Sequence, residues 1–298
     1  MRRSFPVGTF LVVAVIIGGA FFWWQWMRPA PKWMPPATAS SSPATSPQGR
    51  PSPAVVPSPA IGTPAFHYPV PAAPSPRAAL PPLDRADGYV ENALVDLLGR
   101  KAVRSFLHLD GIARNFVATV NNLATDNAAA QLWPVNPTGG KLDTETRDGK
   151  LVISAENADR YAAFVRFAEG VDTQRAVALY IRLYPLFQRA YEELGYPGQY
   201  FNDRVVEVID NLLATPKVAG PIKVKRVSVN GAMPTSGGLY MFDDPSLEAS
   251  TAGQKILLRM GRENAAKLAA KLTDIRQHIV RSSITQSPPA VPSSPHRS

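Results

Sequence analysis

The sequence contains no cysteine among its 298 residues. Disulfide bonds, thiolate metal sites, cysteine nucleophiles and a lipid-modified cysteine near the N-terminus are therefore excluded. Histidine is also scarce, and only His108 and His278 fall inside the part of the chain expected to fold. Two histidines give no support to a histidine-based zinc site, so we expect neither a metal nor a cofactor.

Acidic residues are missing from residues 1–83, which carry six basic side chains. The formal charge of the whole chain is +9, a value that on its own suggests binding to nucleic acid. Within residues 84–281, however, 25 basic residues face all 23 acidic ones, so the net charge there is only about +2. The basic character belongs to the N-terminal part, and we expect no nucleic-acid partner.

Recognisable catalytic motifs are lacking as well. The chain has neither a Gly-x-Ser-x-Gly nor a Ser-x-x-Lys sequence, the arrangements that activate serine in two groups of enzymes. Gly139-Gly140-Lys141 lacks the earlier glycine and the following Ser or Thr of a phosphate-binding loop, so we interpret it as a turn. These absences favour a non-catalytic role without deciding it.

Residues 5–27 form an uncharged, predominantly apolar run of 23 residues. A helix of this length, at about 1.5 Å per residue, spans roughly 35 Å, enough for the core of a bilayer. The alternative is a cleaved signal peptide, because Gly18 and Ala20 have the spacing of a cleavage site. The aromatic residues at 21–26 are typical of a membrane interface and favour an uncleaved anchor, residues 1–27.

The short N-terminal tail and Arg2 and Arg3 favour an anchor whose N-terminus lies inside and whose remainder lies outside. Ala14 and Gly18 have the small-xxx-small spacing that allows two anchors to associate, which is weak support for a dimer.

Residues 28–83 are rich in Pro, Ala and Ser and have almost no large apolar side chain after Met34. Such a composition buries too little surface to offset the entropy lost on ordering, and proline favours extended polyproline II. We expect a disordered tether, and an inert spacer in preference to a proline-motif docking site. Residues 282–298 are similar and are predicted to be a disordered tail.

Residues 84–281 show the hydrophobic periodicity of a mainly α (α+β) domain that is long enough to form a core. Asp87 is expected to cap a first helix that ends near Gly99, and Ser154 or Asn157 to cap a later one. A further helix is expected from about residue 110, and the last helix ends at about residue 281.

Two small β-hairpins are predicted within this domain. The first has alternating residues on either side of Asp148-Gly149, a pair typical of tight turns. The second pairs residues 222–229 with residues 239–242, with a bulge near Lys225-Arg226 because the apolar phase changes there. After it, Asp244-Pro245 is expected to begin a helix that ends at Gly261.

A long helix that begins at Asp172 is predicted to lie at the centre of the domain. Apolar side chains cover most of its circumference, and an arginine ridge runs along the remainder. Pro185 lacks the amide of a helical hydrogen bond, so we expect a kink or break there, and Gly195 is expected to end the helix. Its aromatic stripe consists of Tyr180, Tyr184, Phe187 and Tyr191, and its ridge of Arg175, Arg182 and Arg189.

The stretch from Tyr184 to Arg204 is the best candidate for a binding site. Tyrosine combines apolar area with a hydroxyl group, and Asn202, which is expected to cap the next helix, adds hydrogen-bonding capacity for a peptide or sugar. The competing interpretation is that the tyrosines fill the core and that Asp203 and Arg204 lock the turn. The candidate partner-binding residues are Tyr184, Tyr191, Tyr196, Tyr200, Asn202, Asp203 and Arg204.

One carboxylate cluster merits consideration for catalysis. Asp203, Glu207 and Asp210 recur at helical spacing and share a face, where crowding can raise the pKa of one carboxyl group or gather a cation. A solvated face, or a partner for the arginine ridge, is the commoner role of such a stripe.

Several separated motifs resemble an uncharacterised bacterial family of single-pass, proline-tethered envelope proteins, a domain of unknown function. The motifs lie at residues 114–123, 157–161, 184–204, 244–248 and 253–261. The resemblance extends over about residues 84–276, with a loop at 230–238 longer than the family pattern. It implies a single anchor in the inner membrane of a Gram-negative bacterium, but no activity.

Together these features predict a membrane-anchored periplasmic interaction module that binds an envelope protein or peptidoglycan. The alternative is a peptidoglycan hydrolase that uses Asp203 and Glu207. An energy-transducing arm is less favoured, because the charged Pro-Glu and Pro-Lys repeats of such spacers are missing.

Overall fold

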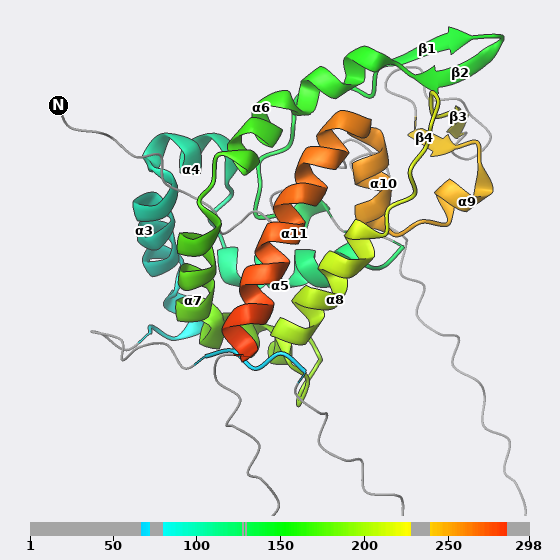
Figure 1. The fold of residues 1–298 in the computed structure, drawn as a ribbon. Helices are drawn as coiled ribbons and strands as arrows, with labels where there is room; N and C mark the ends of the chain where they lie inside the picture. The colour runs from blue at the N-terminus through cyan, green and yellow to red at the C-terminus, as the bar shows by residue number, and fades with distance from the viewer. Residues whose placement is uncertain (1–66, 72–79, 127, 129, 228–238, 285–298) are drawn as a thin grey trace, which may run out of the picture.

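The computed structural model describes residues 67–71, 80–126, 128, 130–227 and 239–284, and these are mainly helical (Figure 1). The helices are α3 (Asp87–Leu98), α4 (Arg100–Phe106), α5 (Ile112–Leu123), α6 (Asp159–Glu169), α7 (Thr173–Glu193), α8 (Phe201–Leu213), α9 (Pro245–Glu248), α10 (Ala252–Arg259) and α11 (Arg262–Ile284). The strands are β1 (Thr144–Arg147), β2 (Lys150–Ile153), β3 (Val224–Val227) and β4 (Leu239–Phe242), and single turns of 3-10 helix cover Leu83–Arg85, Ala130–Leu132 and Ala155–Ala158. The predicted class, mainly α with two small hairpins, is confirmed.

The predicted anchor at residues 5–27, most of the predicted tether and nearly all of the predicted tail lie outside the described residues. Within the described part of the chain, none of the helices combines the length and the apolar character that crossing a membrane requires.

Helix α5 is the most enclosed helix of the main core. Nine of its 12 residues are buried. In α7, which we predicted to be central, the aromatic stripe also faces the core, but ten of 21 residues are buried and the predicted arginine ridge is exposed. α7 also continues through Pro185, so the predicted break is wrong. The core thus forms around α5, with α7 and α8 packed against it and α11 lying across α6, α7 and α8 (Figure 1).

Three side chains predicted to cap helices do not do so. Asp87 lies inside α3, and its Oδ2 accepts a hydrogen bond from the Gly111 N–H at 2.8 Å. Ser154 makes no capping bond, and Asn157 is buried and donates from Nδ2 to the Arg259 carbonyl at 2.7 Å. A short polar side chain near a helix start predicts a local bond, whereas Asp87 and Asn157 join segments far apart in the chain.

Both predicted hairpins are present. Asp148 and Gly149 have φ of 53° and 71°, which is the left-handed backbone that a two-residue turn requires. β3 and β4 pair residue for residue, so the predicted bulge near Lys225 is wrong. The Ile153 N–H donates to the Ile222 carbonyl at 2.9 Å, which joins the two hairpins.

The helix predicted from Pro245 to Gly261 is in fact two helices, α9 and α10. Thr251 begins α10, where its side chain accepts from the Gln254 N–H while the Gln254 side chain accepts from the Thr251 N–H, a capping box. α10 comes close to α8 at Gly253, where an added Cβ would lie 2.4 Å from Leu212 Cδ2. A second, smaller core beside the hairpins consists of Val224, Phe242, Leu247 and Leu258.

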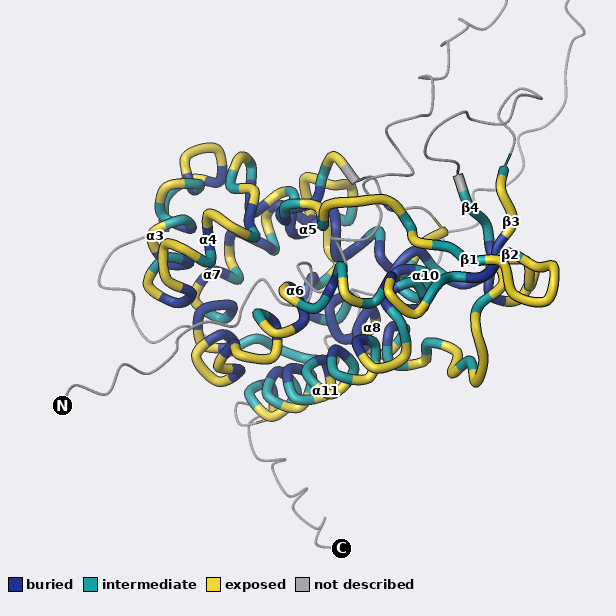
Figure 2. The backbone as a smooth tube through the Cα atoms, turned by 90° about the horizontal axis from the view of Figure 1, so that it is seen from above, coloured by how far each residue is buried: buried dark blue, intermediate teal, exposed yellow. Residues whose placement is uncertain are grey.

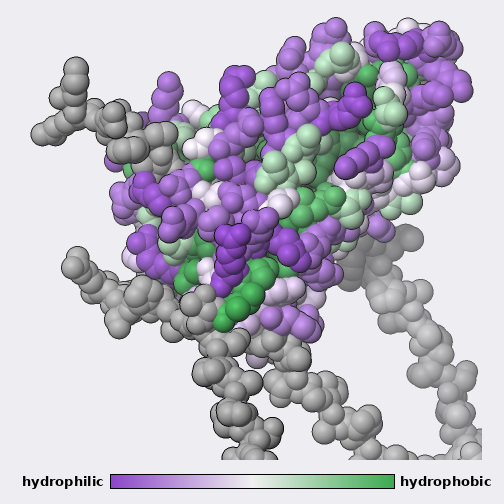
Figure 3. Space-filling view, in the orientation of Figure 1, coloured by the Kyte–Doolittle hydropathy of each residue, from purple (hydrophilic) through white to green (hydrophobic). Residues whose placement is uncertain are grey.

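The surface follows this packing. Figure 2 shows that α11 turns a buried side to the other helices and an exposed side to solvent. The face seen in Figure 3 is predominantly hydrophilic, with hydrophobic side chains visible in the hollows between elements. Two parts of the predicted tether pack on the folded domain. Residues 67–71 run along its surface beside α7, α8 and α11, and Leu83 is buried in the main core.

Candidate functional site

The chain reverses between α7 and α8 through a turn that begins at Gly195. Gly195 has φ of 111°, and its N–H and that of Tyr196 donate to the carbonyls of Glu192 and Tyr191 at 3.1 and 3.3 Å. This is a Schellman motif, in which the residue after the glycine packs back on the helix. The Tyr196 ring stacks on Tyr191 with centroids 4.6 Å apart. The predicted glycine stop is therefore confirmed.

Gln188 holds the start of α8 against α7. Its Oε1 accepts hydrogen bonds from the Phe201 N–H at 2.9 Å and from the Tyr184 hydroxyl at 2.8 Å, while its Nε2 donates to the Gln199 carbonyl at 2.7 Å and to Glu192 at 2.9 Å. The residue that caps α8 is therefore on another helix, and the prediction of Asn202 as the cap is wrong.

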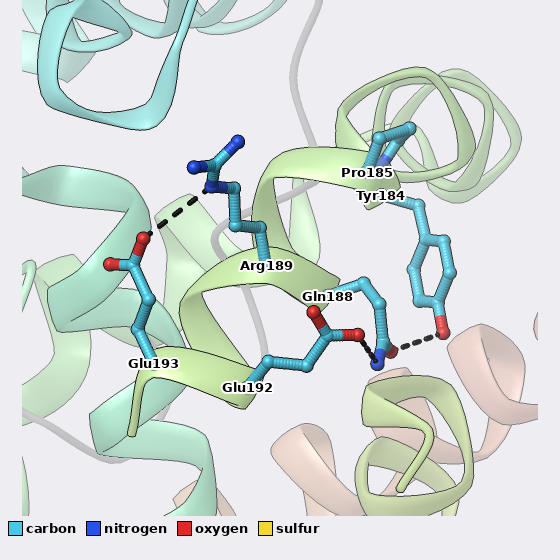
Figure 4. Close-up of a pocket in the computed structure, with 6 residues that line it drawn as sticks. All are labelled: Tyr184, Pro185, Gln188, Arg189, Glu192 and Glu193. Carbon is cyan, nitrogen blue, oxygen red and sulfur yellow. Dashed lines mark hydrogen bonds and ion pairs between the residues drawn. The ribbon is translucent and has the colours of Figure 1, made fainter. Parts of the chain in front are cut away.

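Tyr184 lies on the outer side of this arrangement, half-buried, in a shallow hollow on α7. Figure 4 shows Tyr184, Gln188 and Glu192 pointing toward one another, with Arg189 and Glu193 paired on the other side of the helix. Burial raises the pKa of the Tyr184 hydroxyl above its ordinary value, so it is a hydrogen-bond donor at neutral pH. This hollow is separate from the groove described below.

Asn202 is buried, with 1% of its surface exposed, and both ends of its amide are occupied. Its Oδ1 accepts from the Tyr180 hydroxyl at 2.7 Å, and its Nδ2 donates to the Tyr68 carbonyl at 2.7 Å. Burial raises the pKa of Tyr180 well above its ordinary value, and the neighbouring Tyr184 and Asp203 act in the same direction. Tyr180 therefore remains a donor and fixes the orientation of the Asn202 amide.

Asp203 is the second residue of α8 that contacts the segment 67–71. Its Oδ1 accepts from the Tyr68 N–H at 2.9 Å and its Oδ2 from the His67 N–H at 3.2 Å. The His67 ring also lies 3.5 Å from Oδ2, from Nδ1 to oxygen. Both carboxylate oxygens of Asp203 are thus used to bind consecutive backbone amides.

Arg204 joins α8 to α5. Its Nε and one terminal nitrogen donate to the Asn121 side-chain oxygen and carbonyl at 3.0 and 2.9 Å, and the other lies 2.8 Å from Glu207 Oε1. The Asn121 amide in turn donates to the Tyr196 hydroxyl at 3.1 Å. The competing prediction was that Asp203 and Arg204 lock the turn. Arg204 does hold the turn, because it binds Asn121, which in turn binds Tyr196; Asp203 takes no part in these contacts.

An open groove of about 720 Å³ lies where these contacts meet. It takes in five of the seven predicted residues; Tyr184 lines the separate hollow and Asn202 is buried beneath the segment 67–71. The groove is lined by Tyr191, Tyr196, Tyr200, Asp203 and Arg204 from the predicted set, and by His67, Tyr68, Asn121, Gln199, Val206, Glu207 and Asp210.

The carboxylate stripe of α8 is divided among different partners. Asp203 binds backbone amides, Glu207 pairs with Arg204, and Asp210 forms two hydrogen bonds to Arg276 on α11, one of them 2.9 Å long. Across the described ranges, no three His, Asp or Glu side chains gather closely enough to hold a metal ion. The stripe serves mainly to connect elements.

Sequence reasoning missed His67, Tyr68, Asn121 and Gln188. Asn121 and Gln188 sit within helices at positions that the hydrophobic period does not distinguish. The segment 67–71 did carry a signal, because Phe66 and Tyr68 are the only aromatic residues between residues 35 and 83. An aromatic pair inside a Pro/Ala/Ser-rich stretch indicates a docking point on a folded surface.

The fold and groove define a small helical domain that has a polar, tyrosine-lined surface site and two connected hairpins. A family model described as "Protein of unknown function (DUF3014)" matches residues 112–276, and the chain belongs to this family. Comparison with curated proteins and with solved structures finds no match. The matched region begins at α5 and includes the whole turn from Tyr184 to Arg204, whereas α3, α4 and the segment 67–71 lie before it.

Proposed function

We propose that this protein is an interaction module of the bacterial cell envelope, anchored in the inner membrane by residues 5–27 with its C-terminal domain in the periplasm. Its partner is an envelope protein or peptidoglycan, and the binding surface is the groove between α5, α7 and α8. The open groove of about 720 Å³ carries this proposal. The uncharged run and the proline-rich tether in the sequence support the placement.

The lining of the groove suits a polar chain with flat apolar faces. The Tyr196 ring, which stacks on the buried Tyr191, contributes aromatic area, and Tyr200 and Arg204 contribute hydrogen-bonding groups. Peptides and sugars both present this combination of surfaces. The groups are held by the Arg204–Asn121–Tyr196 contacts, so the surface is organised before a ligand arrives.

The test uses the full chain in detergent micelles, incubated with intact sacculi and, separately, with envelope extract. We expect retention by one of the two, and loss of that retention in Tyr200→Ala. Arg182→Ala, which alters an exposed residue of α7 away from the groove, is the matched control and should bind like the parent. Retention by neither, or equal retention of Tyr200→Ala and the parent, contradicts the proposal.

A peptidoglycan hydrolase remains a second candidate, because Asp203, Glu207 and Asp210 all line the same groove. In this proposal Asp203 and Glu207 are the acid and base. Their present partners, the 67–68 amides and Arg204, have to be released for that role. Digestion of labelled peptidoglycan by the full chain, abolished in Glu207→Gln, is the expected result; no digestion, or unchanged digestion by the variant, contradicts it.

A further inference from the structure

The hydrogen bonds that join the segment 67–71 to α8 all use the backbone of the segment, and the His67 ring adds a contact with Asp203. Asp203 accepts from two consecutive N–H groups, at 3.2 Å from His67 and 2.9 Å from Tyr68, and Asn202 donates to the Tyr68 carbonyl at 2.7 Å. These bonds require a peptide with two adjacent amide hydrogens, and they place no demand on the side chains. The contact therefore has the chemistry of a general peptide-backbone receptor.

The receptor side of this contact is fixed in place. Asn202 is 1% exposed, and the buried Tyr180 hydroxyl occupies its oxygen, so the amide hydrogens can only face the segment. When the segment leaves, this donor loses its carbonyl acceptor, and water or the carbonyl of another peptide has to replace it. The site is built for a peptide carbonyl.

The remainder of the segment shows which peptides fit. Pro69 has no N–H and so needs no acceptor. Val70 and Pro71 lie against a small apolar gap lined by Val177 and Ile181 of α7 and Ile279 of α11. A peptide in which proline and a small apolar residue follow the bound amides satisfies this surface.

We propose that Asn202 and Asp203 form a binding site for a proline-containing peptide, and that residues 67–71 are its ligand in cis. His67 and Tyr68 also line the groove, so their exchange for the corresponding peptide of a protein partner changes the lining at that end of it. The identity of the partner rests on the function proposed above, whereas the cis contact and its peptide chemistry do not.

The first experiment follows amide hydrogen exchange in the full chain in detergent micelles. Only His67, Tyr68 and Val70 of the segment carry amide hydrogens, so its exchange reports directly on the Asp203 bonds. We expect exchange about tenfold faster in Asp203→Ala. Asp96→Ala, which removes an exposed carboxylate of α3 that lines neither the groove nor the gap beside Val70, should leave the rate unchanged. Equal rates in the parent and Asp203→Ala, or protection that increases with protein concentration and so comes from a second copy, would overturn the proposal.

The second experiment supplies the ligand in trans. A labelled synthetic peptide covering residues 64–73 is titrated into the full chain and into Tyr68→Pro, which removes one donor from the cis segment and leaves α8 intact. Because a tethered ligand acts at a high effective concentration, we expect the variant to bind the peptide at least about tenfold more tightly than the parent does. Equal affinity for the two chains, or no effect of adding Asp203→Ala, would overturn the proposal. If the full chain is retained by neither sacculi nor envelope extract, the results of the exchange and titration experiments are unaffected. The proposed function and the proposed peptide site can therefore fail separately.

Discussion

In this domain, single polar side chains join segments that are distant in the chain. Asn121, Asn157, Gln188 and Asn202 each bond to segments distant in the chain, and their amides suit this role because each carries both donors and an acceptor. A local sequence window predicts such residues to be helix caps, as it did here for Asn157 and Asn202. Partners more than a helix away along the chain leave no signal in that window.

The Tyr180–Asn202 pair is expected to be energetically coupled. Tyr180→Phe should lower the free energy of unfolding by about 1 kcal/mol, and Asn202→Ala by about 1–3 kcal/mol because the buried Tyr180 hydroxyl loses this acceptor. In the double variant the effect of Tyr180→Phe should nearly vanish, giving a coupling of about 1 kcal/mol. Urea unfolding of the four chains measures this, and strict additivity of the two losses would contradict it.

Gln188 and Arg189 are adjacent on α7 but should differ in importance. Gln188→Ala removes the acceptor of the Phe201 N–H and of the Tyr184 hydroxyl, so we expect a loss of about 1–3 kcal/mol in unfolding free energy. Arg189→Ala removes only an exposed pair with Glu193, which contributes about 0–1 kcal/mol. Similar losses in the two variants would show that Gln188 does not hold the helices together.

Elements of secondary structure were predictable where a period or a turn residue marked them. The ranges of α5, α7, α8 and α11 follow from apolar spacing, and the first hairpin follows from Asp148-Gly149. α4 and the division between α9 and α10 were not predicted, because the pattern of apolar residues does not change at either place. Of the site, the turn and five groove residues were predictable, but its α5 side and the segment 67–71 depend on packing between distant parts of the chain.

The crossing of α10 with α8 and α5 should tolerate no side chain at Gly253. A Cβ there would lie 2.4 Å from Leu212 Cδ2 and 3.0 Å from the Leu123 carbonyl, so we expect Gly253→Ala to cost about 1–3 kcal/mol. Gly88→Ala, in α3 with nothing within 4 Å of the new methyl, should instead stabilise by about 0.5–1 kcal/mol. Thermal unfolding distinguishes the two, and a neutral Gly253→Ala would mean that the helices separate easily.

The whole domain depends on buried aromatic side chains that are also ionisable. Tyr180 and Tyr161 are buried in the main core, and burial raises the pKa of both hydroxyls; the charges of Arg160 and Arg259 partly oppose the shift at Tyr161. The folded chain therefore binds these protons more tightly than the unfolded chain does. Because of this difference, the free energy of unfolding decreases as the pH becomes alkaline.

The free energy of unfolding is therefore expected to fall with rising pH in the alkaline range. The contribution of these hydroxyls is fully present below the ordinary tyrosine pKa of about 10, and it is lost as the pH rises from there toward the raised folded pKa. Each group should lower the unfolding free energy by about 1.4 kcal/mol per pH unit in that window. Tyr180→Phe should reduce the slope by one such contribution, measured by urea unfolding between pH 9 and about 12. An unchanged slope would contradict the assignment of Tyr180.

In the membrane-anchored protein proposed above, the contact of residues 67–71 with α8 would also set how far the domain can travel from the bilayer. If residues 1–27 are the anchor, residues 28–79, which precede the part of the chain packed at Leu80 and Leu83, would reach roughly 160 Å at about 3.1 Å per residue. Once residues 67–71 are docked, only residues 28–66 span the distance, and the reach falls to roughly 120 Å. Release of these three backbone hydrogen bonds would therefore extend the reach of the tether by roughly 40 Å, so the exchange of peptides at α8 would also set the distance over which the proposed anchored domain searches for its partner.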